Sequence, residues 1–189
     1  MAWLETSELK NGAKVIFDGA PWVVIHVDFV KPGKGQAFYK IRVTNLLTDN
    51  TLEKTLRSGE RIEAADVNDA DMQFLYSDPN GYVFMDKNTY DQLTVTAKAV
   101  GSAKDFLLEN MDVAVTLWNG EAIAVRLANT VVMDVVYTEP AVKGDTQSRV
   151  MKPAKLVTGA EIKVPIFVAT GDRISINTQT REYAGRVDK

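Results

Sequence analysis

The chain has 189 residues, of which 46% are hydrophobic and 25% are charged, and its formal net charge is -3. This balance is typical of a water-soluble globular protein, and no run approaches the roughly 18 apolar residues that a membrane span needs. The absence of cysteine excludes disulfides and thiol chemistry. The first residues, MAWLETSELKNG, lack the basic start and apolar core of a secretory signal, so we expect a cytoplasmic protein.

The charge is distributed unevenly along the chain. Residues 1–64 carry nine Lys/Arg and eight Asp/Glu (+1), residues 65–127 four and ten (-6), and residues 128–189 nine and seven (+2), which sums to -3. Phosphate contacts are made chiefly by Lys and Arg, so the net charge argues against a protein that simply coats nucleic acid. The two ends are suited to RNA and the middle is not. Ordinary drift of charge on solvated faces is the alternative.

The first strands are predicted around a hairpin. In KVIFDGAPWVVIHVDFV, residues 14–30, two apolar runs meet at Asp18-Gly19, which is a strong hairpin turn signal. The second run alternates and predicts a half-buried strand. One face of that strand is expected to hold Val23, Ile25, Val27 and Phe29, and the other Val24, His26, Asp28 and Val30.

The next predicted strand lies in AFYKIRVTNLL, residues 37–47, and has one apolar and one basic face. The apolar face consists of Tyr39, Ile41 and Val43, and the basic, solvent-exposed face of Lys40, Arg42 and Thr44. Further turns are predicted at residues 48–50, 78–81 and 119–120. A helix is predicted only in TAKAVGSAKDFLLENM, residues 96–111, with a glycine that weakens its middle.

Short strands separated by frequent turns predict small β-barrels, because closing a sheet removes its exposed edges. The polar stretches ERIEAADVND (60–69) and RLANT (126–130) divide the chain into three expected units, 1–64, 65–127 and 128–189. Units of this size are marginally stable alone, so we expect them to pack against their neighbours. Three such units in a row would reach about 80 Å, the scale of a transfer RNA.

The segment FVKPGKGQAF, residues 29–38, predicts an exposed loop with Lys34 at its apex. Pro32 restricts the backbone and biases Lys31 toward extended conformations, while Gly33 and Gly35 permit positive φ. Lys34 has no apolar wall or cationic neighbour to lower its pKa, which disfavours a Schiff base. The sequence GKGQ also lacks the ending and the following helix of a phosphate-binding P-loop. A solvated turn lysine without a role is the plain alternative.

Other polar and aromatic residues are assigned structural roles. His26 is the only histidine, and without cysteine it predicts an exposed strand residue rather than a zinc ligand. Trp22 and Trp118 are expected in barrel cores, and Asp69 and Asp71 in a solvated loop. No serine-nucleophile motif or catalytic carboxylate pair is present. We therefore expect no enzyme activity, cofactor or metal.

The motifs in the chain together resemble those of the bacterial elongation factor P family. FVKPGKGQAF is similar to the lysine loop of that family, and KPAKLVTGAEIKVPIFVATG, residues 152–171, is similar to its carboxy-terminal signature. Three shorter matches are LWNG at 117–120, KGDT at 143–146 and REYAGRV at 181–187. The likeness covers essentially the whole chain.

The resemblance implies an all-β, L-shaped arrangement like that of transfer RNA, with an N-terminal KOW-like barrel and two OB-fold barrels. It implies a monomeric factor that binds the ribosome between the P and E sites and relieves stalling at consecutive prolines. In such a factor Lys34, presented by Lys31, Pro32, Gly33 and Gly35, reaches the CCA end of peptidyl-tRNA. Modifying enzymes commonly extend this lysine by β-lysylation, while hydroxylation, another modification or none stays open.

Candidate RNA contacts follow partly from the residues and partly from the resemblance. Lys40 and Arg42 form the basic strand face. Tyr183 and Arg186 match positions through which the family contacts RNA, and Gly144, Asp145 and Thr146 match a loop near the exit-site codon. QSRVMKPA, residues 147–154, replaces a commonly glycine-rich stretch, which leaves open whether this loop makes the same contacts. A general single-strand-binding OB-fold protein and a paralogue that resembles elongation factor P are the rival interpretations.

Overall fold

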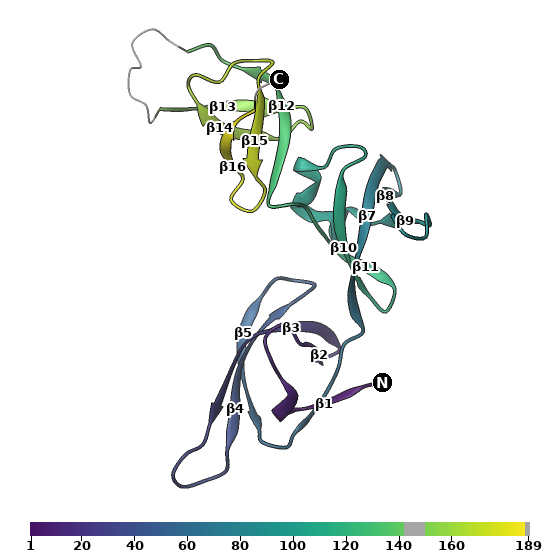
Figure 1. Cartoon of the computed structure of the whole chain (residues 1–189), viewed down its shortest axis with the longest axis vertical. Helices are drawn as coiled ribbons and strands as arrows, with labels where there is room; N and C mark the ends of the chain where they lie inside the picture. The colour runs from purple at the N-terminus through teal and green to yellow at the C-terminus, as the bar shows by residue number, and fades with distance from the viewer. Residues whose placement is uncertain (142–149, 188–189) are drawn as a thin grey trace. The chain divides into compact units, whose positions relative to one another are not determined.

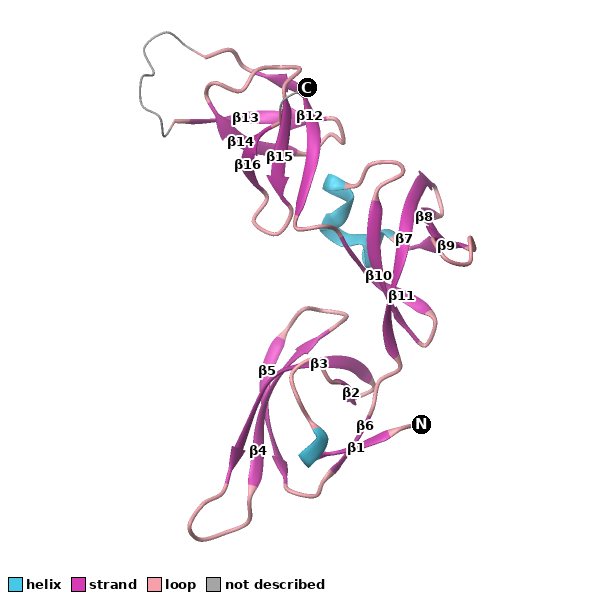
Figure 2. Cartoon of the chain, viewed as in Figure 1, coloured by secondary structure: helices cyan, strands magenta, loops and turns pink. Residues whose placement is uncertain are grey.

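A computed structural model describes residues 1–141 and 150–187, and most of its regular structure is β-strand (Figure 2). The helical segments are short: η1 (Thr6–Glu8), α1 (Ala97–Val100) and η2 (Gly101–Phe106). No helix in the described ranges is both long and apolar enough to cross a membrane. The expectation of an all-β chain of small antiparallel sheets is confirmed.

The first sheet packs around a hydrophobic core whose buried residues are spread from Leu9 to Ile62. It contains β2 (Lys14–Phe17), β3 (Ala20–Val30), β4 (Phe38–Asn45) and β5 (Thr51–Arg57) in sequence order, and β1 (Trp3–Glu5) pairs separately with β6 (Arg61–Glu63). An isolated bridge between Val15 and Ala64 connects β2 to the end of β6. The buried core consists of Leu9, Val15, Trp22, Val24, Ile41, Val43, Leu56 and Ile62.

The second sheet has the strand order β11-β10-β7-β8-β9. Its strands are β7 (Val67–Asp78), β8 (Gly81–Asp86), β9 (Gln92–Val95), β10 (Asp112–Trp118) and β11 (Glu121–Arg126). Phe74 and Phe84 lie opposite each other on β7 and β8 with ring centroids 5.3 Å apart. This aromatic pair anchors the apolar side of the sheet.

The third sheet has the order β14-β13-β12-β15-β16, and its outer strands β14 and β16 lie near each other. Its strands are β12 (Thr130–Thr138), β13 (Met151–Leu156), β14 (Glu161–Pro165), β15 (Arg173–Asn177) and β16 (Glu182–Arg186). The core includes Met133, Leu156, Ile174 and Ile176, and Phe106 from η2 joins it. The η2 segment, which precedes β10 in the chain, therefore contributes a residue to the core of the third sheet.

The chain groups into two compact units. One comprises Met1–Ala70 with Thr116–Ala124, and the other Asp71–Val115 with Val125–Lys189. The tip of the β10–β11 hairpin belongs to the first unit, where the Asn119 N–H donates to the Asp66 carbonyl at 3.0 Å. The division into 1–64, 65–127 and 128–189 stays a prediction.

The hairpin turns at Asp18-Gly19 and Asn119-Gly120 are confirmed. Asp18 and Gly19 have φ of 53° and 74°, and Phe17 pairs with Ala20 across them. Asn119 and Gly120 have φ of 51° and 82°. Positive φ at both central residues matches the right-handed twist of the flanking strands.

The predicted alternation in β3 is correct in period but wrong in phase. The register with β4 shifts between Val24 and His26, as at a β-bulge. Trp22 and Val24 face the core before the bulge, and Val27 and Phe29 lie on that same face after it. Ile25 is 41% exposed at the bulge, and Phe29 is 54% exposed because it lies beyond the end of the core. One extra residue in a strand moves every later side chain to the other face.

The predicted helix over 96–111 is wrong in length. The Thr96 hydroxyl caps α1 by accepting from the Ala99 N–H at 3.3 Å, but the α-helix ends at Val100 because Gly101 has φ of 57°. A 3-10 segment continues to Phe106. The glycine therefore interrupts the helix, and residues after Phe106 are not helical.

Two smaller expectations are also corrected. Asp69 and Asp71 lie within β7 rather than in a loop, and Asp69 accepts a hydrogen bond of 2.7 Å from the Thr116 hydroxyl. Trp22 is buried as expected, but Trp118 is only half-buried and lines a cavity of about 740 Å³ with Met1, Ala2, Ile16 and neighbouring residues. Trp118 is therefore not a core residue.

Candidate functional site

The β3–β4 hairpin places the predicted loop at its far end. The strands pair from Trp22↔Asn45 at the base to Val30↔Phe38 beside the loop, and residues 31–37 connect them. Figure 1 shows this loop at the tip of the long hairpin, where β4 begins. The buried residues Val24 and Val43 lie near the base. The core thus holds the hairpin at one end and leaves the loop free to project.

Lys34 is exposed at this loop, and within residues 1–141 and 150–187 it has no hydrogen-bond or ion-pair partner. Of its two glycine neighbours only Gly35 adopts a positive φ, 115°, so the expectation that both residues supply it holds for one. A Cβ on Gly35 would lie 3.7 Å from the Pro32 Cγ, an ordinary contact. The loop therefore depends on the backbone freedom of Gly35 rather than on space around it.

The predicted basic face of β4 is present. Lys40 and Arg42 are exposed and lie opposite Asp28 and His26 of β3. His26 is an exposed strand residue, as expected, and its Nε2 lies 3.0 Å from Asp28 Oδ2. From residue 29 to residue 48 the sequence holds four Lys/Arg and no Asp or Glu. The loop and β4 are thus cationic, and Asp28 of β3 is the acid that faces Lys40.

The carboxy-terminal candidates lie on β16 and are held by neighbours. The Tyr183 ring packs edge-on against Phe167, with centroids 6.3 Å apart. The Arg186 Nη2 lies 3.0 Å from Asp172 Oδ1. An RNA contact by either residue would compete with these internal contacts. Gly144, Asp145 and Thr146 lie outside the described residues.

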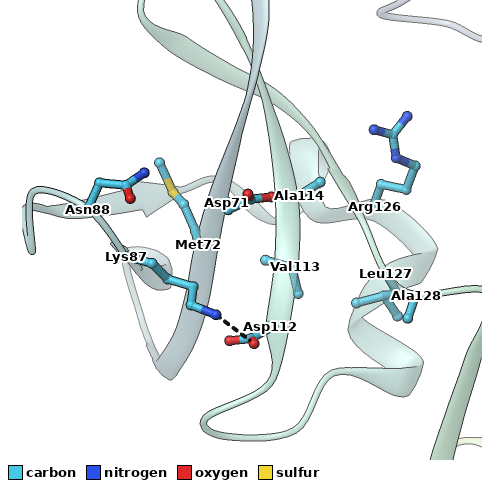
Figure 3. Close-up of a pocket in the computed structure, with 10 residues that line it drawn as sticks. All are labelled: Asp71, Met72, Lys87, Asn88, Asp112, Val113, Ala114, Arg126, Leu127 and Ala128. Carbon is cyan, nitrogen blue, oxygen red and sulfur yellow. Dashed lines mark hydrogen bonds and ion pairs between the residues drawn. The ribbon is translucent and has the colours of Figure 1, made fainter.

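A pocket of about 360 Å³ lies on the second sheet and was not foreseen from the sequence (Figure 3). Lys87 Nζ lies 2.7 Å from Asp112 Oδ2 at its wall. The hydrogen bond and the charge of Asp112 raise the pKa of Lys87 above its ordinary value. Because the lysine and the carboxylate neutralise each other, the pair offers neither a general base nor a free cation.

Metal chemistry has no evident site in the described part of the chain. There, no group of three or more His, Asp or Glu residues is placed to hold a metal ion.

The sequence did not predict the aromatic pair of Phe29 and Tyr39, which lie directly opposite each other on β3 and β4. The bulge in β3 brings Phe29 to the same face as Tyr39, beyond the end of the core, and no local sequence signal marks that bulge.

Three family models match successive parts of the chain. The "Elongation factor P (EF-P) KOW-like domain" matches residues 5–62, the "Elongation factor P (EF-P) OB domain" residues 67–125, and "Elongation factor P, C-terminal" residues 131–186. The matches together extend over most of the sequence. They agree with the KOW-like and OB-fold architecture that the motifs implied.

Curated relatives match the chain over nearly its full length. "Elongation factor P" of Synechococcus sp. (strain JA-2-3B'a(2-13)) is 49% identical over 183 residues, which cover 97% of this chain and 99% of the relative. "Elongation factor P" of Symbiobacterium thermophilum is 46% identical with the same coverage. Identity at this level over whole chains indicates common family membership.

Solved structures support the fold. "Eukaryotic translation initiation factor 5A from Methanococcus jannaschii" aligns with a TM-score of 0.55 at 20% identity and covers 67% of this chain and 94% of that chain. A translation initiation factor eif-5a family protein from Naegleria fowleri aligns with a TM-score of 0.54 at 16% identity, covering 67% and 98%. At such low identity these alignments support the fold alone.

Proposed function

The chain belongs to the elongation factor P family of translation elongation factors, and from this we propose that it acts on the ribosome between the P and E sites. There it stimulates peptide-bond formation and relieves stalling at consecutive prolines. The ribosome supplies the catalytic centre, and this protein is not itself an enzyme. It works as a cytoplasmic monomer whose contacts are ribosomal RNA and peptidyl-tRNA.

The observation that carries this proposal is the position of Lys34. Its side chain is exposed beyond the core of the hairpin, on a segment that carries four Lys/Arg and no acid. A cation without a competing partner is available to phosphate and ribose oxygens. Held near the CCA end of peptidyl-tRNA, it favours a reactive geometry by reducing the entropy that the reaction must lose.

Modification of Lys34 extends this mechanism. Addition of β-lysine would lengthen the arm and add an amine, which increases its reach without changing the loop. The modifying enzyme needs access to the lysine, and the exposed loop supplies that access. Lys31, Pro32, Gly33 and Gly35 present the side chain, with Gly35 setting the direction of the backbone.

The remaining RNA contacts are assigned to two regions. Lys40 and Arg42 on β4 contact the acceptor end of the same transfer RNA. Tyr183 and Arg186, together with the segment of Gly144, Asp145 and Thr146, contact RNA at the other end of the chain. These contacts supply affinity, whereas Lys34 acts on the geometry of the reaction, so the two effects are separable.

The test is reconstituted translation of a message with three consecutive prolines. It compares wild type carrying its native modification with Lys34→Ala, Lys34→Arg and no factor, and a message without proline runs is the control. We expect both variants to fail in stimulation while retaining part of their ribosome binding. Lys34→Arg keeps the charge but is not a substrate for lysine extension. Full stimulation by Lys34→Ala would overturn the proposal.

A further inference from the structure

An aromatic pair lies just below the Lys34 loop. Phe29 and Tyr39 are each five residues from Lys34, on opposite sides of it, and face each other across β3 and β4. Their ring centroids are 4.9 Å apart with an interplanar angle of 46°. Tyr39 packs partly against the core of the first sheet, whereas the Phe29 side is 54% exposed. The pair thus presents one supported aromatic surface to solvent.

Hairpin stability alone does not account for this exposure. A cross-strand aromatic pair contributes modestly to a sheet, and it does so equally well when covered. Phe29 lies on the core-facing side of β3, next to Val27, but it stands beyond the end of the core, so a large ring stays in water beside the loop. Exposed rings beside unpaired cations are typical of surfaces on which unpaired nucleotides stack.

The charge around the pair identifies the partner. Lys31 and Lys34 lie at the same end of the hairpin as the pair, and no Asp or Glu occurs between residues 29 and 48. Lys40 lies on the other face of β4, opposite Asp28. An apolar pocket of a protein partner would need no such excess of positive charge. A nucleic-acid strand would match it, because the phosphates meet the lysines while a base meets the ring.

We propose that Phe29, supported by Tyr39, is a stacking platform for a base of an unpaired RNA end whose backbone runs toward Lys34. Five residues of extended chain separate Phe29 from Lys34 by at most about 18 Å. A stacked strand advances about 3.4 Å per nucleotide, so one unpaired end of a few nucleotides reaches both. The inference rests on the proposed function, in which that end is the 3′ end of peptidyl-tRNA. Phe29 and Tyr39 act there as positioning residues, because they hold the RNA end in place relative to Lys34.

The experiment separates stacking from apolar contact and from folding. Phe29→Leu keeps an apolar side chain without a ring, Phe29→Tyr keeps the ring, and Tyr39→Leu removes its support. Trp3→Ala is the matched control, because Trp3 is 56% exposed in the same unit but lies on β1. All proteins carry the same Lys34 state, verified by intact mass, and their urea midpoints are measured.

Two readouts are used. One is binding of a short single-stranded RNA ending in CCA, and the other is chemical reactivity of the terminal adenine of P-site transfer RNA on ribosomes. We expect Phe29→Leu and Tyr39→Leu to weaken oligonucleotide binding by about 5- to 150-fold, the range for one lost base–aromatic stack. On ribosomes, we expect wild type to lower the reactivity of the terminal adenine, and we expect these two variants to leave that reactivity unchanged. Phe29→Tyr and Trp3→Ala should behave as wild type.

Other outcomes overturn the inference in distinguishable ways. If wild type stimulates polyproline translation and Phe29→Leu protects the adenine equally well, the platform is wrong and the proposed function stands. If Phe29→Leu at matched Lys34 state binds RNA and protects the adenine as wild type does, but is modified at Lys34 more slowly in a separate reaction with its modifying enzyme, the surface binds a protein rather than RNA. If wild type neither stimulates nor protects, the proposed function fails and the inference fails with it.

Discussion

Arg181 and Asp105 form an ion pair, with Nη2 2.9 Å from Oδ2, that joins the β15–β16 turn to the end of η2. The Arg181 guanidinium also lies 5.1 Å from the centroid of the Phe106 ring, and Phe106 is 1% exposed within the core of the third sheet. The Thr158 hydroxyl donates to the Asp105 carbonyl nearby. The η2 segment is therefore an integral part of the carboxy-terminal core.

Phe106→Ala should destabilise the protein more than any single break of the surrounding polar contacts. Removal of a buried phenylalanine costs about 3–5 kcal/mol through lost transfer energy and the cavity left behind. Arg181→Ala is the control, since an ion pair this exposed contributes about 0–1 kcal/mol. Urea unfolding checks both. Similar losses for the two variants would mean that the polar contacts, not the ring, hold η2 in place.

Gly81→Ala should be strongly destabilising, and Gly171→Ala only mildly so. Both glycines have positive φ, 146° and 90°, which costs an alanine about 1–3 kcal/mol. A Cβ at Gly81 would also lie 2.4 Å from the Val95 carbonyl oxygen, whereas nothing lies within 4 Å of one at Gly171. Thermal unfolding of the two variants separates steric overlap from backbone strain. Equal losses would contradict the close approach of β8 and β9.

Asp86→Asn should weaken the dependence of stability on acid pH while preserving the fold. The carboxylate accepts from the N–H groups of Thr89 and Asn88, at 3.0 Å and 2.7 Å, and these bonds, Thr89 first, hold the pKa of Asp86 below its ordinary 3.8. A depressed carboxyl pKa stabilises the folded state above the unfolded pKa, and this stabilisation is lost as pH falls through the folded value. Asparagine accepts the same bonds without titrating.

The measurement is the urea midpoint near neutral pH and again below 3.8, the ordinary aspartate pKa. Asp86→Asn should be less stable than wild type at neutral pH, because its neutral oxygen accepts the two bonds more weakly than the carboxylate, and the two should converge on acidification. Asp86→Ala, which loses both bonds, should be weaker than Asp86→Asn at either pH. Asp91→Asn removes a charge from the same turn and serves as the control. An acid dependence in Asp86→Asn identical to that of wild type would show that Asp86 does not supply it.

This turn recurs in each sheet, which explains part of what the sequence predicts well. Asn45, Asp86 and Asn177 each accept from the N–H groups two and three residues later, and Asp49, Tyr90 and Arg181 each have positive φ four residues after them. Short side chains that bond their own backbone favour such turns. The turn at 48–50 was predicted, whereas those at 86–91 and 177–182 were not.

What the sequence did not predict arises from non-local pairing. The bulge between Val24 and His26 depends on the register with β4, and it reversed the face assigned to Phe29. The polarity of Asp69 and Asp71 predicted a loop, but strand pairing places both residues in β7. In contrast, the Lys34 loop depends on local residues, and its exposure was predicted correctly. The exposed aromatic pair beside it needed the three-dimensional register.

Gly35→Ala and Gly33→Ala provide the sharpest test of how the loop presents Lys34. Only Gly35 has positive φ, 115°, so alanine there costs about 1–2 kcal/mol unless the loop changes its course. Alanine at Gly33 meets nothing within 4 Å and should change stability by less than about 0.5 kcal/mol. An exposed loop relieves strain by rearranging, so we expect Gly35→Ala to redirect Lys34 rather than unfold the protein.

The readout is stimulation of polyproline translation at matched Lys34 modification, with unfolding midpoints measured in parallel. Gly33→Ala should retain most of the stimulation, and Gly35→Ala should lose most of it at a nearly unchanged midpoint. Lys34 would still be present and charged in Gly35→Ala, so its loss of activity would isolate direction from charge. If both variants stimulate equally, the backbone at Gly35 does not set the direction of Lys34. If both fail equally, the loop tolerates no side chain beside Lys34, and steric access rather than φ limits its action.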